Sequence, residues 1–206
     1  YTGAPFYAAE ASLKIGGDLS FVFCCKQAAI PIKSYSPELM CTPWYDDEKK
    51  DDESSAEIAK RVLEFFPRMH SMVVGPGLGR DPKVLEATGI IIKEAKKIGM
   101  PLVLDADALY FLSTSKEGID AVKGHEKCIL TPNRVEFGRL IEGVLSDWKD
   151  ESPDSVPEQL LLLSKVLQGP TILLKGKSDL ICDGKTVYEV EETGSLRRSG
   201  GQGDIL

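Results

Sequence analysis

In Met72-Val73-Val74-Gly75-Pro76-Gly77-Leu78-Gly79-Arg80-Asp81-Pro82, a short apolar run enters a glycine-rich turn, and the helical pattern that follows ends at Ile98. A second apolar run, residues 102–105, comes directly after that helix. Short apolar runs separated by helices are typical of parallel strands that are covered on both faces. This stretch therefore predicts a βα unit of a mostly parallel sheet.

The same alternation extends in both directions along the chain. Strands are expected at residues 19–24, 72–75, 102–105, 128–131 and 171–175, and helices at about residues 5–15, 56–66, 82–98, 135–141 and 156–168. Ser55 is the expected N-cap of the second helix, and Gly99 is expected to end the third. The pattern predicts an α/β fold in which helices cover both faces of the sheet.

Three other segments complete this outline. Asp183-Gly184-Lys185 lies between the apolar runs 180–182 and 186–190, so it predicts a late β-hairpin. The charge-rich residues 46–52 are expected to form a solvated loop, with an interaction patch as the alternative, and residues 147–157 a surface connection. Neither segment marks a domain boundary, so residues 1–206 are expected to form a single domain.

The composition excludes several classes of partner. The chain has a formal net charge of −7 and a pI near 5.0, whereas nucleic acids and anionic membranes require a basic face. No apolar run approaches the roughly 18 residues that a membrane span needs. The five scattered cysteines are expected to be reduced core thiols, and with only two histidines a structural zinc site is not expected. A small anionic ligand remains compatible with this composition because backbone amides can bind phosphate.

The two ends of the sequence suggest a piece cut from a longer chain. It begins with Tyr1 and stops at Leu206, just after a glycine cluster that resembles the entrance to a helix. A targeting segment before Tyr1 is therefore left open. Cytoplasmic localisation is expected, with mitochondrial or plastid targeting as the alternative. The sequence also leaves open whether the protein forms a homo-oligomer.

The glycine cluster Ser199-Gly200-Gly201-Gln202-Gly203-Asp204 is the strongest candidate for chemistry. Glycines permit positive φ and leave no Cβ between backbone amides and a bound anion, so this segment can wrap a phosphate. Asp204 beside it would accept a proton from a hydroxyl that attacks a γ-phosphate. The alternative is a plain loop in which Asp204 caps a helix.

Two strand ends carry further candidates. The turn at residues 75–82 lacks the register of a dinucleotide fingerprint, so it predicts either a ligand-binding rim or a tight turn that only packs. Asp105 and Asp107 follow the next strand and would organise Mg²⁺, unless Asp107 caps a short helix.

The next two strands end in polar groups as well. After the fourth strand, Thr131, Asn133 and Glu136 present polar side chains, or Asn133 and Glu136 form a capping box. Lys175-Gly176 would meet a nucleotide phosphate, unless Lys175 is an ordinary surface lysine. Polar or glycine residues at five such places predict a single phosphate-binding rim.

Six segments in this order resemble the eukaryotic ATP-dependent NAD(P)H-hydrate dehydratases: residues 1–5 (YTGAP), 75–80 (GPGLGR), 105–108 (DADA), 131–137 (TPNRVEF), 175–179 (KGKSD) and 195–204 (SLRRSGGQGD). The resemblance implies a ribokinase-like three-layer α/β/α fold. It also implies the ATP-dependent restoration of NADH or NADPH from the S form of the hydrated nucleotide, assisted by Mg²⁺ and yielding ADP and phosphate.

The resemblance further implies roles for individual residues. Asp204 would be the catalytic base. Contacts to the hydrated nucleotide would come from Gly77, Asn133, Arg134, Val135, Glu136, Phe137, Gly138, Arg139 and Asp204. ATP would be held by Lys175, Gly176, Lys177, Ser178, Asp179, Gly194, Ser195, Leu196, Arg197, Arg198, Ser199, Gly200, Gly201, Gln202 and Gly203. Metal ligands are not assigned.

Two features set this chain apart from that family. The family has a glycine-rich segment before the YTGAP run and further helices after the Gly-Asp pair, and this sequence has neither. The 206-residue piece is therefore expected to have little or no activity by itself. A small-molecule kinase, such as a vitamin-precursor kinase, and a nucleotide-binding module without catalysis are the alternative functions.

Overall fold

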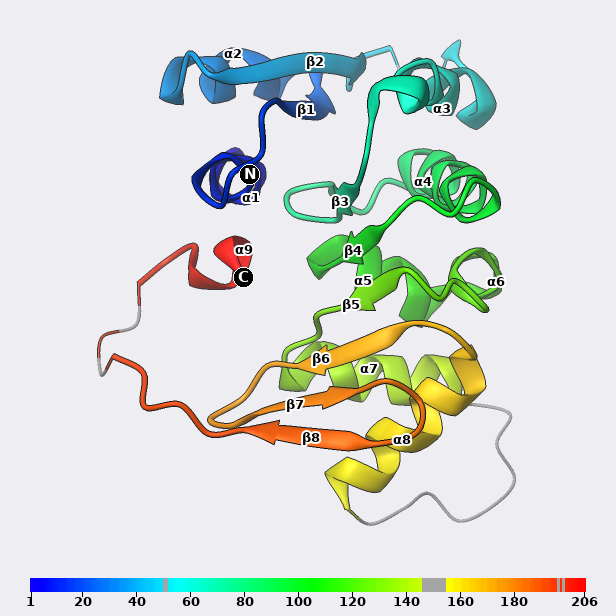
Figure 1. The fold of residues 1–206 in the computed structure, drawn as a ribbon. Coiled ribbons are helices and arrows are strands. Elements are labelled where there is room, and N and C mark those ends of the chain that lie inside the picture. Colours follow the sequence, from blue (N-terminus) through cyan, green and yellow to red (C-terminus); the bar gives the residue numbers. More distant parts are fainter. Residues whose placement is uncertain (50–51, 146–154, 196, 198) are drawn as a thin grey trace.

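The computed structural model describes residues 1–49, 52–145, 155–195, 197 and 199–206 (Figure 1). Its main sheet contains β3 (Met72–Val74), β4 (Leu102–Leu104), β5 (Cys128–Leu130), β6 (Thr171–Leu174), β7 (Asp179–Cys182) and β8 (Val187–Val190), in that spatial order. β3 to β6 are parallel, and β6 to β8 are antiparallel. The predicted mostly parallel sheet and the late hairpin are confirmed.

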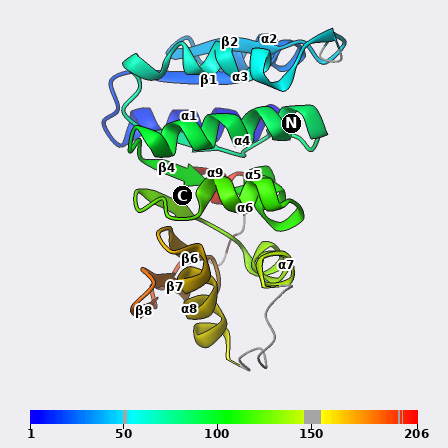
Figure 2. The same cartoon turned by 90° about the vertical axis from the view of Figure 1, so that its right-hand side faces the viewer.

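A second, two-stranded parallel sheet contains β1 (Ser20–Cys25) and β2 (Leu39–Tyr45). The helices are α1 (Gly3–Lys14), α2 (Lys26–Tyr35), α3 (Ser55–Leu63), α4 (Pro82–Lys97), α5 (Ala106–Thr114), α6 (Lys116–Val122), α7 (Arg134–Val144), α8 (Val156–Leu167) and α9 (Gln202–Ile205), with a short 3₁₀ turn at Phe66–Arg68. In both views α1 and α9 lie on the opposite side of the strands from α3, α4 and α6 (Figures 1 and 2). The result is the expected arrangement of helix, sheet and helix.

Alternation along the strands explains these layers. Val22 and Cys24 of β1 pack with Leu39 and Cys41 of β2 against α1 and α2. The intervening Phe23 packs on the other side, with α3 and α4. Successive side chains of a strand point to opposite faces, so this small sheet supports a helical layer on each side.

The largest core cluster lies between β4 to β6 and the helices α4 to α8. Leu104, Leu130 and Ile172 come from three adjacent strands and are fully buried. These strands are short and almost entirely apolar because both of their faces are covered. Their rigid core fixes the positions at which the strands end, and therefore the rim where the candidate residues lie.

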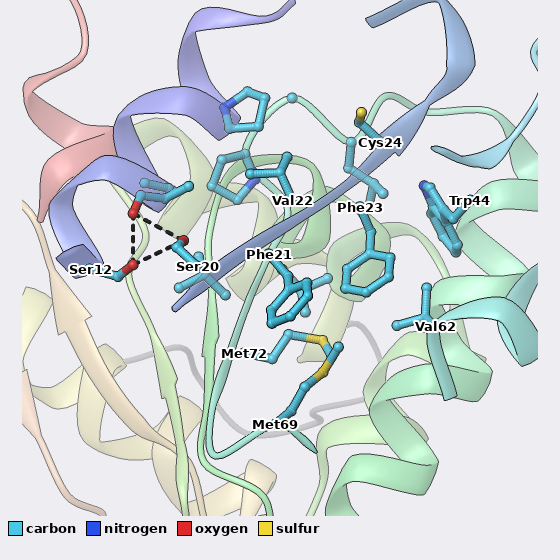
Figure 3. A pocket seen from close by; sticks show the side chains of 18 of the residues that line it. Ser12, Ser20, Phe21, Val22, Phe23, Cys24, Trp44, Val62, Met69 and Met72 are labelled. Carbon is cyan, nitrogen blue, oxygen red and sulfur yellow. Dashed lines mark hydrogen bonds between the residues drawn. The ribbon is translucent and has the colours of Figure 1, made fainter. Parts of the chain in front are cut away.

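The strand expected at residues 19–24 forms, as β1, but it does not belong to the main sheet. β1 pairs with β2 and not with β3, and the alternating pattern of the sequence did not reveal α2 or β2. Pro31 lies inside α2 and Pro43 inside β2, and proline weakens the local signal for either element. A cavity of about 540 Å³ separates β1 from β3, lined by Phe21 on one side and Met72 on the other (Figure 3).

The start of α3 also differs from the sequence prediction. The N-cap is Ser54 and not Ser55: its hydroxyl accepts a hydrogen bond from the Glu57 N–H, and the Glu57 carboxylate accepts one from the Ser54 N–H. Ser55 instead donates to Glu86 at 2.7 Å. The end of α4 is as predicted, because Gly99 follows it with a φ of +65°.

We expect Ser54→Ala to lower the free energy of unfolding by about 1 kcal/mol, because the first turn of α3 loses its capping hydroxyl. Urea unfolding would measure this difference. Ser34→Ala is the matched control, since Ser34 is an exposed serine whose hydroxyl donates to the nearby Pro31 carbonyl and caps no helix start. Equal midpoints for the two variants would contradict the capping role.

The five cysteines are all free thiols, as expected. Cys24, Cys41, Cys128 and Cys182 are buried, and burial raises the pKa of Cys128 to about 12. Such thiols stay protonated at neutral pH and are therefore poor nucleophiles. Among the described helices, none is long and apolar enough to cross a membrane.

Candidate active site at the carboxyl ends of the parallel strands

The ends of β3, β4, β5 and β6 lie at one edge of the sheet because these strands run in parallel. Backbone hydrogen bonds tie the segments that follow them to one another. The Asp105 N–H donates to the Val74 carbonyl at 3.0 Å, and the Lys175 N–H donates to the Pro132 carbonyl at 2.8 Å. The predicted gathering of strand ends on one rim is therefore found in the structure.

Lys175 and Asp105 form an ion pair at the centre of this rim. The Lys175 Nζ lies 2.8 Å from the Asp105 Oδ1, and the two side chains are only 19% and 9% exposed. A Cβ at Gly203 would lie 3.7 Å from the same Nζ. The late glycine-rich segment thus meets the strand ends through Lys175, even though it is distant in sequence.

Asp204 shares this environment. Its pKa is raised above the usual aspartate range, first by burial and then by the negative charge of Asp105, while Lys175 acts in the opposite direction. A carboxylate with a raised pKa is a stronger base toward a hydroxyl proton. Asp204 is the third residue of α9, whose N-cap position is Gly201, so the alternative role of Asp204 as a cap is wrong.

The glycine turn after β3 is shaped by close packing. A Cβ at Gly75 would lie 1.8 Å from the Asp105 carbonyl oxygen, and one at Gly77 would lie 2.7 Å from the Pro5 ring; both glycines have positive φ. Asp107 braces the same turn by accepting from the Gly79 N–H and the Arg80 Nε, each at 3.0 Å. Asp107 is therefore not the N-cap of α5, a position that Asp105 occupies.

The segment after β5 begins with a capping box. Asn133 Oδ1 accepts from the Val135 and Glu136 N–H groups, and the Glu136 carboxylate accepts from the Asn133 N–H at 2.8 Å. The structural alternative for these two side chains is thus confirmed. Phe137 is buried in the core, so only its backbone is available to a ligand on the rim.

Further along α7, Arg139 lines a hollow beside the glycine turn. Arg139 and Glu136 line a small hollow together with Arg80, which stacks on the Tyr110 ring at 4.2 Å. Arg134 and Gly138 lie on the same helix, and Val135 is exposed. Of the residues that the resemblance assigns to the nicotinamide nucleotide, Glu136 and Arg139 therefore lie near Arg80, at the end of the glycine turn.

The remaining candidates for ATP contact lie in two segments. In the turn between β6 and β7, the Gly176 N–H donates to Asp179 at 2.8 Å, which shapes the loop that carries Lys177 and Ser178. In the second segment Gly201 packs against the Tyr7 ring, beside Gly200 and Gln202. Gly194, Ser195, Arg197 and Ser199 are exposed, and Leu196 and Arg198 lie outside the described residues.

The structure modifies the expectation of a single cleft. The large cavity between β1 and β3 extends to Gly75 and Gly77, but it does not include Lys175 or Asp204. We take the rim as the candidate site because the titratable groups meet there, whereas the cavity has a mainly apolar lining. Tyr7 and Tyr110 are contact residues that the sequence did not single out, since only the folded chain brings them to Gly201 and Arg80.

The rim has limited capacity to hold a metal ion by itself. Across the described residues, no group of three or more His, Cys, Asp or Glu side chains is placed to hold one. Mg²⁺ in nucleotide sites takes many of its ligands from phosphate and water and needs only one or two carboxylates. These residues therefore suit an ion that binds together with a nucleotide.

Comparison with known proteins shows the family of the chain. Residues 1–206 match the family described as NAD(P)H-hydrate dehydratase. The chain is 46% identical to the ATP-dependent (S)-NAD(P)H-hydrate dehydratase of Vitis vinifera and 45% identical to that of Bos taurus. These matches cover 100% of the chain but 58% and 59% of the relatives, so the chain spans somewhat more than half of their length.

Solved structures support the fold. A ribokinase-like protein of Enterococcus faecalis matches with a TM-score of 0.73 at 20% identity, covering 100% of this chain and 64% of its own. The ADP/ATP-dependent NAD(P)H-hydrate dehydratase of Bacillus subtilis, co-crystallised with ATP/Mg²⁺ and soaked with CoA, matches with a TM-score of 0.61 at 20% identity, covering 99% of this chain and 66% of its own. With the ribokinase-like fold, the ordered strand-end motifs and the match over its whole length, the chain belongs to the NAD(P)H-hydrate dehydratase family.

Proposed function

We propose that this chain carries the catalytic residues of an ATP-dependent (S)-NAD(P)H-hydrate dehydratase. In this proposal the S form of hydrated NADH or NADPH returns to NADH or NADPH, while ATP becomes ADP and phosphate. The observation that carries it is the meeting of Asp105, Lys175 and the Gly203-Asp204 pair at one rim, in a chain whose curated relatives bear that name.

Lys175 and the glycine-rich segment would hold the phosphates of ATP. The Lys175 ammonium supplies a point charge for a phosphate oxygen, and glycines leave the backbone amides open to an anion. Mg²⁺, bound with the nucleotide, would neutralise phosphate charge. The nicotinamide nucleotide would lie along Gly77 and the segment from Asn133 to Arg139, with Arg139 and Arg80 near its own phosphates.

Asp204 would then act as the base. Its carboxylate takes the proton of the ring hydroxyl as the hydroxyl oxygen bonds to the γ-phosphorus, and the bond from that phosphorus to the ADP oxygen breaks. Next the carbon–oxygen bond of the phosphorylated ring breaks, phosphate leaves, and the neighbouring ring carbon loses a proton to restore the double bond. Positioning and charge neutralisation supply most of the catalysis in such phosphoryl transfers.

The partners in this proposal are small molecules, namely the hydrated nucleotides and ATP. The proposed compartment is the cytoplasm or, with a leader sequence, a mitochondrion or a plastid.

Incubation of the protein extended to the full length of its relatives with hydrated NADH, ATP and Mg²⁺ tests the proposal, because the chain spans only 58% of the Vitis vinifera relative. We expect the absorbance of the dihydronicotinamide to return, with one phosphate released for each NADH restored. A phosphorylated product without restored NADH would favour a small-molecule kinase instead. ATP binding without any conversion of the substrate would favour a nucleotide-binding module.

A further inference from the structure

Asp105 is a buried carboxylate on the rim to which the proposed dehydration assigns no role. The Asp107 carboxylate accepts hydrogen bonds from Gly79 and Arg80. Asp105 occupies the N-cap position of α5, but its side chain makes no capping hydrogen bond there. Its carboxylate is buried and meets the Lys175 ammonium 70 residues further along the chain. A buried ion pair between two strand ends requires both groups to be held in place.

The backbone around Asp105 is fixed from both sides. Its N–H donates to the Val74 carbonyl at 3.0 Å, and its carbonyl accepts from the Ala108 N–H at 3.0 Å. Ala106 adopts a φ of +48°, which is strained for a residue with a Cβ. Strained backbone that the surrounding structure enforces is found disproportionately at functional sites. The fold therefore fixes the backbone from which the Asp105 side chain projects, and burial of that side chain, which is 9% exposed, restricts where its carboxylate can lie.

Of the two side chains, lysine has the greater intrinsic flexibility. A lysine side chain has four rotatable carbons and loses considerable entropy when it is confined. Lys175 is held with its Nζ 2.8 Å from Asp105 and next to Gly203, on the side where Asp204 lies. An ammonium has three donors, so one hydrogen bond to Asp105 leaves the others available to a phosphate.

We propose that Asp105 is a positioning residue: it holds the Lys175 ammonium against the Gly203-Asp204 segment, ready to meet a phosphate of the bound nucleotide. The role resembles that of the glutamate that orients the phosphate-binding lysine of protein kinases. The inference rests on the proposed function, since it takes the phosphate partner of Lys175 to be ATP.

Calorimetric titration of Mg·ATP into four proteins tests this role: the wild type, Asp105→Asn, Lys175→Met and the double variant. We expect Lys175→Met to weaken ATP binding by about tenfold or more, as for a lost charge-assisted hydrogen bond. We expect Asp105→Asn to weaken it by about threefold to tenfold. In the Lys175→Met background the Asp105 substitution should no longer weaken ATP binding, because Asp105 acts through the lysine, and loss of its uncompensated charge should if anything strengthen binding.

The sign of the Asp105 effect is decisive. Removal of a negative charge beside a phosphate site by itself strengthens the binding of an anion, so weaker binding by Asp105→Asn indicates loss of the lysine position. The same weakening with metal-free ATP separates this cause from loss of a Mg²⁺ contact. Tighter or unchanged binding by Asp105→Asn would overturn the positioning role while leaving Lys175 as an ATP contact. An unchanged dissociation constant for Lys175→Met would instead remove Lys175 from the ATP site of the proposed function.

Two controls separate position from stability. Glu53→Gln removes a carboxylate from another ion pair, with Arg61 at 2.7 Å, and should bind Mg·ATP like the wild type. Asp105→Glu keeps the charge and should recover part of the lost affinity, which a purely structural role of the Asp105 volume would not explain. Urea unfolding of each variant establishes that it is folded under the titration conditions. If Asp105→Asn does not fold, Asp105→Glu is measured with and without Lys175→Met, and the difference gives the coupling between positions 105 and 175 in ATP affinity.

Discussion

In the full-length protein, Asp204→Asn should lower the turnover of hydrated NADH by roughly 10²-fold or more while ATP still binds. The amide has nearly the shape of the carboxylate but cannot take the hydroxyl proton, and general base catalysis contributes a factor of about this size. Restored dihydronicotinamide absorbance would measure turnover, and calorimetry would measure ATP binding. Asp120→Asn, at an exposed position of α6, is the matched control and should turn over like the wild type.

The pH profile gives the same prediction a second readout. Asp204 must be ionised to act as a base, so turnover should fall as the pH drops through its pKa. Because burial and the Asp105 charge raise that pKa, the acidic limb should lie above the usual range of an aspartate. Asp204→Asn should lose this limb altogether. Unchanged turnover, or an identical acidic limb in the variant, would remove Asp204 from the mechanism.

Features governed by local chemistry were readable from the sequence. The four strands β3 to β6 are apolar runs that end at glycine, aspartate, threonine or lysine, and each was placed within a residue or so of its position. The Asn133 and Glu136 capping box was visible because its two side chains are three residues apart. Such signals depend on neighbours along the chain, so one sequence is sufficient to find them.

Features governed by register and packing were not readable. Nothing in the sequence near residue 105 or residue 175 indicates that the two side chains meet, because the pairing depends on how β4, β5 and β6 align. The separation of β1 from β3 was missed for the same reason. The order of the motifs located the candidate segments, whereas the structure showed which of their side chains already form hydrogen bonds or ion pairs within the protein.

The Gly75 turn should be the least tolerant position of the rim, and Gly75→Ala should lower the free energy of unfolding by more than about 4 kcal/mol. An added Cβ would lie 1.8 Å from the Asp105 carbonyl oxygen and 2.9 Å from the Ala108 nitrogen, in a backbone with a φ of +121°. Both contacts are with backbone that is itself hydrogen-bonded, so neither neighbour can move cheaply.

Gly79→Ala is the matched control for this substitution. Gly79 lies in the same turn and also has positive φ, +86°, but a Cβ there meets nothing within 4 Å. It should therefore show only the conformational cost of about 1 kcal/mol. Urea midpoints would compare the two variants, and equal losses would mean that the left-handed backbone, and not the approach to Asp105, requires the glycine. If Gly75→Ala remains folded, it should also weaken Mg·ATP binding, because any shift of the Asp105 backbone moves the carboxylate that holds Lys175.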